Sequence, residues 1–237
     1  MTPKGGALVY YETDPIGIPI EAPTKYIRML DRNLGASRLH DGYLNTCDAD
    51  YDACGYTYVW GRMEPMSTPN MHIKATPNSA LTGYGWENGK GYEVRTPADT
   101  WNWGETDPAS NPCPAGYALP ARLDMSSLLL WIKAKEGLPD EAQSPVRLEH
   151  AYKYLRLTPT GYRSAGNGTW ATDNDKGYFW CADPSGGNPN ASGVFQAYML
   201  QIKAISCTKN NTIVNNNNPI NGGGGVRCVR ITTTADE

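Results

Sequence analysis

Residues 111–120 read NPCPAGYALP, and residues 121–135 continue with ARLDMSSLLLWIKAK. In the second stretch Leu128, Trp131 and Ile132 fall on one face of a helix, and Met125 and Leu129 join them. A proline just before the pattern, an aspartate in its first turn and lysines in its last turn are typical of helix boundaries. The sequence therefore predicts one main helix at about residues 121–136, entered from a turn that contains a cysteine.

Outside this helix the apolar residues recur with a period of two. The segments that read as strands are Tyr26–Leu30, Tyr154–Thr158, Ala197–Ile205 and Val226–Ile231. Clusters of turn-forming residues separate them, such as Asn221–Gly225. No linker divides the chain. We predict a single α+β domain over residues 1–237, with long irregular insertions at about residues 40–112.

The chain is poor in aliphatic residues and rich in aromatic and turn-forming ones. Its 237 residues include 15 Tyr, 7 Trp, 25 Gly and 18 Pro, but only 2 Phe. This composition argues against a helical bundle, and a net charge of −3 is too small for charge-driven disorder. We expect a folded, loop-rich protein with an aromatic core. Trp131 should belong to that core, whereas Trp170 and Trp180, beside polar loops, should be partly exposed. For Trp180 the alternative is a structural role.

Several broad classes of protein are excluded. No apolar run reaches the roughly 20 residues of a membrane-spanning helix. The first residues lack the three regions of a signal peptide, so the protein is either cytoplasmic or virion-borne, or a leader has been removed. The pI of about 5.7 does not indicate the excess of Lys and Arg that is typical of a nucleic-acid-binding domain. We expect no transmembrane segment and no nucleic-acid partner.

The number and spacing of the cysteines bear on whether the protein works in an oxidising or a reducing compartment. The chain has six: Cys47, Cys54, Cys113, Cys181, Cys207 and Cys228. The chain has no C-x-x-C motif, and none of its three histidines is near a cysteine, so the spacing argues against zinc. Disulfides, which imply an oxidising compartment, are the favoured interpretation, and buried free thiols are the alternative. Spacing alone does not assign the pairs.

Metal and catalytic motifs are weak. Asp48, Asp50 and Asp52 alternate like the ligands of a calcium loop, but Ala53 and Val59 stand where an EF-hand needs Gly and Glu. We favour a disulfide-closed acidic surface loop and expect no metal or cofactor, with calcium left open. The chain has no nucleophile elbow and no zinc-protease motif. Gly222–Gly225 precedes a strand, so it reads as a turn rather than a phosphate loop. We expect no enzymatic activity and no catalytic residues.

Residues 177–221 are the part of the chain most typical of a binding surface. Half of the asparagines fall between Asn188 and Asn221, beside Tyr and Trp, the residue types that paratopes favour. The Asn pairs and runs read as loops, because Asn tolerates left-handed backbone. The alternative is a solvated, sequence-tolerant loop. The candidate ligand-binding residues are Trp180, Asp183, Asn188, Asn190, Phe195, Gln196, Tyr198, Lys209, Asn210, Asn211, Asn215, Asn216, Asn217 and Asn218.

A set of segments, in order, resembles the Fibrobacter succinogenes major paralogous domain, an extracellular family common in Bacteroidetes-type bacteria. The segments are Asp31–Ser37, Tyr56–Arg62, Trp101–Gly104, Asn111–Pro120, Gly161–Arg163, Gly177–Trp180 and Gly225–Arg230. Each is weak alone, but seven in the right order extend over about 200 of the 237 residues. The resemblance implies a C-type-lectin-like fold, with a twisted antiparallel sheet, one main helix, long loops, disulfides and terminal strands that bring the two ends of the chain together.

The resemblance also implies that Cys113, before the helix, bonds Cys228 in the last strand. The family continues its Tyr-Trp motif with Ser-Ser, whereas this chain reads Trp180-Cys181-Ala182. From this departure we predict that Cys181 bonds Cys207, and that Cys47 and Cys54 close a small loop. The related sulfatase-modifying enzymes use a cysteine pair on this scaffold, which Cys181 and Cys207 could imitate.

The Asn-rich region resembles the variable segment of proteins diversified by retroelements, which use the same scaffold. Adenine-directed mutagenesis acts there on Asn-type codons, although similar Asn-rich endings occur in family members without such an element. The resemblance implies non-catalytic recognition of a protein or glycan ligand on another surface, by an extracellular or cell-surface adhesin, at a pilus tip for example. The alternatives are a phage receptor-binding protein on a virion surface, and a structural subunit of a surface assembly that binds no ligand.

Overall fold

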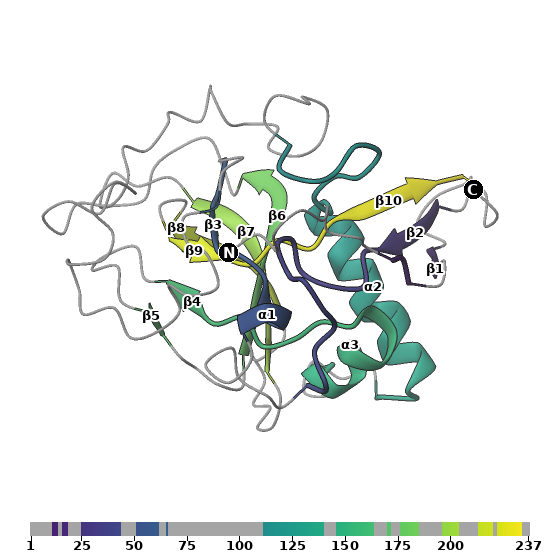
Figure 1. Ribbon diagram of the computed structural model, residues 1–237. Helices are drawn as coiled ribbons and strands as arrows, with labels where there is room; N and C mark the ends of the chain where they lie inside the picture. The colour runs from purple at the N-terminus through teal and green to yellow at the C-terminus, as the bar shows by residue number, and fades with distance from the viewer. Residues whose placement is uncertain are drawn as a thin grey trace, which may run out of the picture.

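The protein is described from a computed structural model. The residues that it describes are 11–13, 16–18, 25–43, 51–61, 65, 111–139, 146–163, 170–171, 176–184, 196–203, 213–219 and 222–233 (Figure 1). In this part of the chain the helices are α1 (Tyr51–Cys54), α2 (Arg122–Lys135) and α3 (Leu148–Leu155). The helices pack beside small antiparallel sheets, so the mixed α+β class is confirmed.

Three sheets are formed within the described residues. The first contains β1 (Ile16–Ile18), β2 (Lys25–Met29) and β10 (Val229–Thr232). The second contains β3 (Tyr58–Val59), β9 (Gly223–Gly224), β4 (Tyr162–Arg163) and β5 (Trp170–Ala171). The third contains β6 (Lys176–Pro184), β7 (Gln196–Lys203) and β8 (Ile213–Pro219).

Helix α2 is the helix that the periodicity predicts, and its bounds agree. Met125, Leu128 and Ile132 are fully buried and belong to one hydrophobic cluster. Trp131, expected in the core, is instead half-buried and packs against the edge of that cluster. The indole has a polar N–H and a large surface, so it lies where its outer edge stays in contact with water.

Helix α3 corrects the strand predicted at Tyr154–Thr158. Leu148, Ala151 and Leu155 are buried at positions three and four residues apart, which is a helical period. The helix ends at Arg156, whose φ of 54° is left-handed. The apparent period of two therefore comes from the last turn of a short amphipathic helix and the residues that follow it.

The C-terminal segment passes between the sheets and joins them (Figure 1). Strand β9 pairs with both β3 and β4, and β10 pairs with β2 over four residue pairs. Between them, Gly225 exchanges backbone hydrogen bonds with β6, through Tyr178 and Trp180. The predicted pairing of strands from the two ends of the chain is thus present in β2 and β10.

The glycines before β10 form strand β9, not the predicted turn. A Cβ on Gly222 would lie 2.2 Å from the Tyr162 hydroxyl, and one on Gly224 would lie 2.6 Å from Cε of Met199. The same Cβ on Gly224 would lie 3.2 Å from Nε1 of the Trp180 indole. Glycine is favoured at these two positions because the backbone passes directly over packed side chains.

The core has two clusters, and only one of them is aromatic in the way the composition suggests. The cluster between α2, α3 and β7 is mainly aliphatic, with Phe179 as its aromatic member. The other cluster is built around Trp60 and Trp180, which are both buried. Trp60 Nε1 donates to the Cys181 carbonyl at 2.9 Å, and Trp180 Nε1 donates to the Tyr58 carbonyl at 2.8 Å. These two bonds tie β3 to β6.

Arg227 is fully buried and uses all of its donor groups. It donates two hydrogen bonds to Asn33 Oδ1, at 3.0 and 2.7 Å, and others to the carbonyls of Leu30, Leu155 and Arg156 at 2.7–3.0 Å. Asn33 in turn donates to the Cys54 carbonyl at 2.8 Å. Burial lowers the pKa of Arg227 to about 9, against the opposing charge of Asp31, so the side chain stays charged at neutral pH.

The disulfide predictions divide into three outcomes. Cys113 and Cys228 are bonded, as predicted, with their Cα atoms 5.8 Å apart and a sequence separation of 115 positions. Cys181 carries a free, buried thiol, so the predicted bond between Cys181 and Cys207 is wrong. Cys181 lies under α2 in the aliphatic cluster, where it packs as a small hydrophobe. Cys54 is bonded, and Cys47, its predicted partner, lies outside the described residues.

Replacing Arg227 by Met should lower the free energy of unfolding by at least about 3 kcal/mol, because four buried oxygens lose a donor at about 1–3 kcal/mol each. Arg227→Lys should lower it by a smaller amount, since an ammonium has three donors. Urea denaturation followed by circular dichroism measures both. Arg147→Met, at an exposed arginine before α3, is the control and should stay within about 0.5 kcal/mol of wild type. A loss for Arg227→Met no larger than that of the control would contradict this role.

The state of Cys181 can be checked by alkylation and peptide mass mapping without reductant. We expect the Cys181 peptide to remain unlabelled in the native protein and to take up iodoacetamide after unfolding in urea. The peptides of Cys113 and Cys228 should be recovered as one disulfide-linked pair under both conditions. A Cys181 peptide recovered in disulfide linkage would overturn the assignment.

Candidate functional site

The predicted binding surface falls on the third sheet, and the structure describes eight of its fourteen candidate residues. Asp183, Gln196 and Tyr198 are half-buried near one end of β6 and β7. Trp180 is 0% exposed, so the prediction that it is partly exposed is wrong, and its side chain is not available to a ligand. Its indole packs under Gly224, donates to the Tyr58 carbonyl and is enclosed by the aromatic cluster.

The Asn run gives a second correction. Asn215–Asn218, predicted as a loop, lie in strand β8, which pairs with β7. The neighbouring strand supplies the hydrogen-bond partners that the backbone needs, and this outweighs the low strand propensity of asparagine. The other candidates lie outside the described residues: Asn188, Asn190, Phe195, Lys209, Asn210 and Asn211.

Tyr198 lies where the register of β7 shifts against both of its neighbours. Along β8, Met199 pairs with Asn215 and Ala197 pairs with Asn218, so two asparagines lie opposite Tyr198. Along β6, Met199 pairs with Trp180 and Ala197 pairs with Pro184, so Cys181–Asp183 lie opposite it. Extra residues on both sides make β-bulges, which bend a sheet and re-aim its side chains. The Asn run and Asp183 are therefore both brought next to Tyr198.

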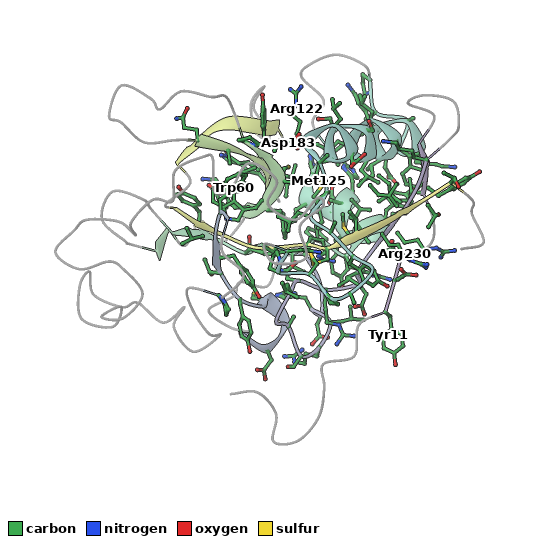
Figure 2. All side chains as sticks on the ribbon, turned by 90° about the horizontal axis from the view of Figure 1, so that it is seen from above. Tyr11, Trp60, Arg122, Met125, Asp183 and Arg230 are labelled. Carbon is green, nitrogen blue, oxygen red and sulfur yellow. A yellow bond between two sulfur atoms is a disulfide. The ribbon has the colours of Figure 1, made fainter. Side chains whose placement is uncertain are left out.

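The N-terminal end of α2 lies beside this part of the sheet. The Asp183 carboxylate accepts a hydrogen bond from the backbone N–H of Arg122, and Figure 2 shows the two residues close together. Ala121, the residue before the helix, has no side chain that can cap, so a residue from β6 supplies the cap. Asp124 accepts from the Ala121 N–H at 3.2 Å. Burial raises the pKa of Asp124; this hydrogen bond opposes the shift, and the negative charge of Asp183 adds to it.

Arg122 is the residue at this site that sequence reasoning missed. Its guanidinium carbon lies 4.9 Å from the centre of the Tyr198 ring, and its Nη1 lies 3.4 Å from the Tyr198 hydroxyl. Arg122 is exposed, so the pair presents a cation and a phenol to solvent. One feature of the sequence could have pointed to Arg122: it is a cation in the first turn of the predicted helix, where the helix dipole disfavours positive charge. Such a placement indicates a role other than helix stability.

The site offers hydrogen-bond donors and acceptors, a positive charge and an aromatic ring. Burial raises the pKa of the Cys181 thiol, and a protonated thiol is a poor nucleophile, so Cys181 is not an activated cysteine. Among the described residues no group of three His, Cys, Asp or Glu side chains could hold a metal ion. Of the predicted acidic loop, Asp48 and Asp50 lie outside the described residues.

Comparison of the chain with protein-family models, with curated proteins and with solved structures finds no match. In the described part of the chain, no helix has the length and the apolar composition to span a membrane.

The cap on α2 can be tested apart from any ligand. Asp183→Ala should lower the free energy of unfolding by about 1 kcal/mol, because the first helical N–H loses its acceptor and the helix dipole loses a nearby negative charge. Asp183→Asn keeps an acceptor and should lose less. Thermal and urea denaturation measure the difference. Equal stability of wild type and Asp183→Ala would show that Asp183 is not used as a cap.

Proposed function

We propose that this chain is a non-catalytic recognition domain that binds a protein or glycan ligand with the surface around Tyr198. This surface consists of Arg122, Asp183, Gln196, Tyr198 and the backbone of Asn215–Asn218. The observation that carries the proposal is the pair of bulges that flank Tyr198, which bring polar residues from β6 and β8 to one aromatic ring. The exposed Arg122 guanidinium over that ring adds a charged donor.

The scaffold under this surface supports the proposal. Met199 and Leu200, directly after Tyr198, are fully buried, as are Trp180 and Cys181 on the neighbouring strand. Residues whose neighbours are locked by packing hold their positions without a ligand, which lowers the entropy lost on binding. Recognition surfaces combine such fixed aromatic anchors with adaptable polar side chains.

The family resemblance is also part of the proposal. Segments that carry the resemblance come from distant parts of the sequence and contact each other: Asn33 with Arg227, Trp180 with the carbonyl of Tyr58, and Cys113 with Cys228. Such convergence supports a common framework of the C-type-lectin-like kind. A disulfide within the chain is compatible with an oxidising, extracellular setting. We therefore propose a cell-surface adhesin, with a virion receptor-binding protein and a structural subunit as the other outcomes.

An array of glycans and host surface proteins tests the proposal with three forms of the whole chain. Wild type should bind a defined set of spots. Arg122→Gln combined with Tyr198→Ala should lose at least tenfold of that binding, because both side chains that face solvent at the bulge are removed. Arg147→Gln changes an exposed arginine on another helix and should bind like wild type. Surface plasmon resonance on the strongest spot then gives the dissociation constants.

Two results would contradict the proposal. Equal binding by wild type and the double variant would place recognition elsewhere on the molecule. Ordered polymerisation together with an empty array would favour a structural subunit instead.

Replacing Asn215–Asn218 by Ser and Gly examines β8 in the same assay. The resemblance to variable proteins that retroelements diversify can be tested in the genome. Such diversification requires a near-copy of the gene's 3′ end that differs at adenines, and a genome without this copy would contradict diversification of this chain.

A further inference from the structure

A separate pocket lies at the other end of α2. It has a volume of about 530 Å³ and lies between the C-terminal halves of α2 and α3 and the segment before β1. Pockets that bind small molecules in proteins are typically about 300–1,000 Å³. Lys135 in its wall is thirteen residues beyond Arg122, a distance of roughly 20 Å along a helix at 1.5 Å per residue. The pocket is therefore distinct from the surface around Tyr198.

One wall of the pocket is aromatic. Trp131 and Tyr154 meet edge to face, with ring centroids 5.1 Å apart and an interplanar angle of 84°. The Tyr154 hydroxyl donates to Glu136 at 2.6 Å, which fixes the phenol ring. Neither Trp131 nor Tyr154 is fully buried, although both pack against the core. Because the two rings are nearly perpendicular, the pocket offers a ligand the face of one ring and the edge of the other.

The pocket also carries positive charge that its own acids do not neutralise. Lys135 lies over the Trp131 ring at 5.4 Å, and Arg156 lies over the Tyr152 ring at 5.2 Å. Within the described residues neither cation has an acidic partner. The acids of the wall are already paired with other cations. Glu12 binds Arg230 through both of its oxygens, and Asp31 binds Arg32 in the same way.

The polar groups of the wall retain capacity for further hydrogen bonds. From the described residues, Oδ2 of Asp31 accepts one hydrogen bond, from Arg32, and a carboxylate oxygen can accept two. From the same residues, Oε2 of Glu12 accepts one hydrogen bond, from Arg230. The Thr13 hydroxyl accepts from Met29 N–H at 3.1 Å and can still donate. These groups can bind hydroxyls of a ligand without losing the hydrogen bonds they already make.

We propose that this pocket binds an acidic sugar residue, a six-membered sugar ring that bears a carboxylate. The apolar C–H face of the sugar ring would lie in the corner formed by Trp131 and Tyr154, on the face of one ring and beside the edge of the other, and its carboxylate would bind Lys135 and Arg156. Its hydroxyls would donate to the spare acceptors of Glu12 and Asp31. A bare anion would use the two cations alone, and a neutral sugar would use the wall and the acids alone. The acidic sugar uses all three features.

Titration of the whole, oxidised chain with simple glycosides tests this inference. The signal is the indole N–H resonance of Trp131, identified by its loss in Trp131→Phe. Methyl β-glucuronide or the methyl glycoside of N-acetylneuraminic acid should shift it in a saturable way, and the two probes distinguish a uronic from a sialic acid. The neutral methyl β-glucoside should bind at least fivefold more weakly than the acidic glycoside that binds.

Variants at exposed positions show whether the acidic glycoside binds in this pocket. Lys135→Gln and Arg156→Gln should each weaken its binding at least fivefold. Arg147→Gln, at the opposite end of α3, is the matched control and should not change its binding. Arg122→Gln with Tyr198→Ala should also leave it unchanged, so failure here is distinguishable from failure at the Tyr198 surface.

Three results would overturn the inference. One is no saturable shift with either acidic glycoside, and another is wild-type affinity in both pocket variants. The third is an equal shift of the Trp131 resonance by sodium sulfate at the same ionic strength, which would indicate an anion site instead of a sugar site.

Discussion

The buried guanidinium of Arg227 is the interaction on which the rest of this structure depends. A charged group without contact with water must have every donor satisfied, since the cost of burying it is otherwise several kcal/mol. Here the acceptors come from two separate places: Asn33 and Leu30 after β2, and the carbonyls of Leu155 and Arg156 at the end of α3. Arg227 can be buried only when both are in position, so it couples the formation of distant parts of the chain.

This coupling fixes the C-terminal segment and, through it, both sites. The residues on either side of Arg227 bond the backbone of Leu30 and Leu34, and Cys228 is held to Cys113. Gly225 exchanges backbone hydrogen bonds with β6, and the indole of Trp180 in β6 donates to the Tyr58 carbonyl of β3. From this fixed strand the bulge at Cys181–Asp183 reaches both Tyr198 and the start of α2. The pocket at the other end of α2 depends on the same framework, because Arg156 accepts from Arg227 through its carbonyl while its side chain lines the pocket.

Sequence patterns predicted those elements that local chemistry determines. Helix α2 follows from its apolar period, and β2 and β7 follow from alternation, with bounds within two residues of those observed. The errors occur where packing outweighs local preference. Asparagine disfavours strands, yet β7 gives β8 its hydrogen-bond partners. Glycine favours turns, yet Gly224 is needed in a strand because Trp180 and Met199 leave no room for a Cβ. For the candidate site, the sequence grouped Tyr198 and Asn215–Asn218 only as parts of one stretch, whereas the pairing of β7 with β8 makes them neighbours. Arg122 was missed because it comes from a different part of the sequence.

By itself the sequence determined an α+β chain with a main helix at about residues 121–136, observed as Arg122–Lys135, and a cysteine on each side of it, because helix periodicity and capping are properties of neighbouring residues. Only the tertiary structure decided that Cys181 is a buried thiol, that Trp180 belongs to the core, and that Trp131, Tyr154, Lys135 and Arg156 share one pocket. The physical reason is that burial and side-chain contact depend on which distant segments pack together, and in this protein a single buried arginine selects those segments.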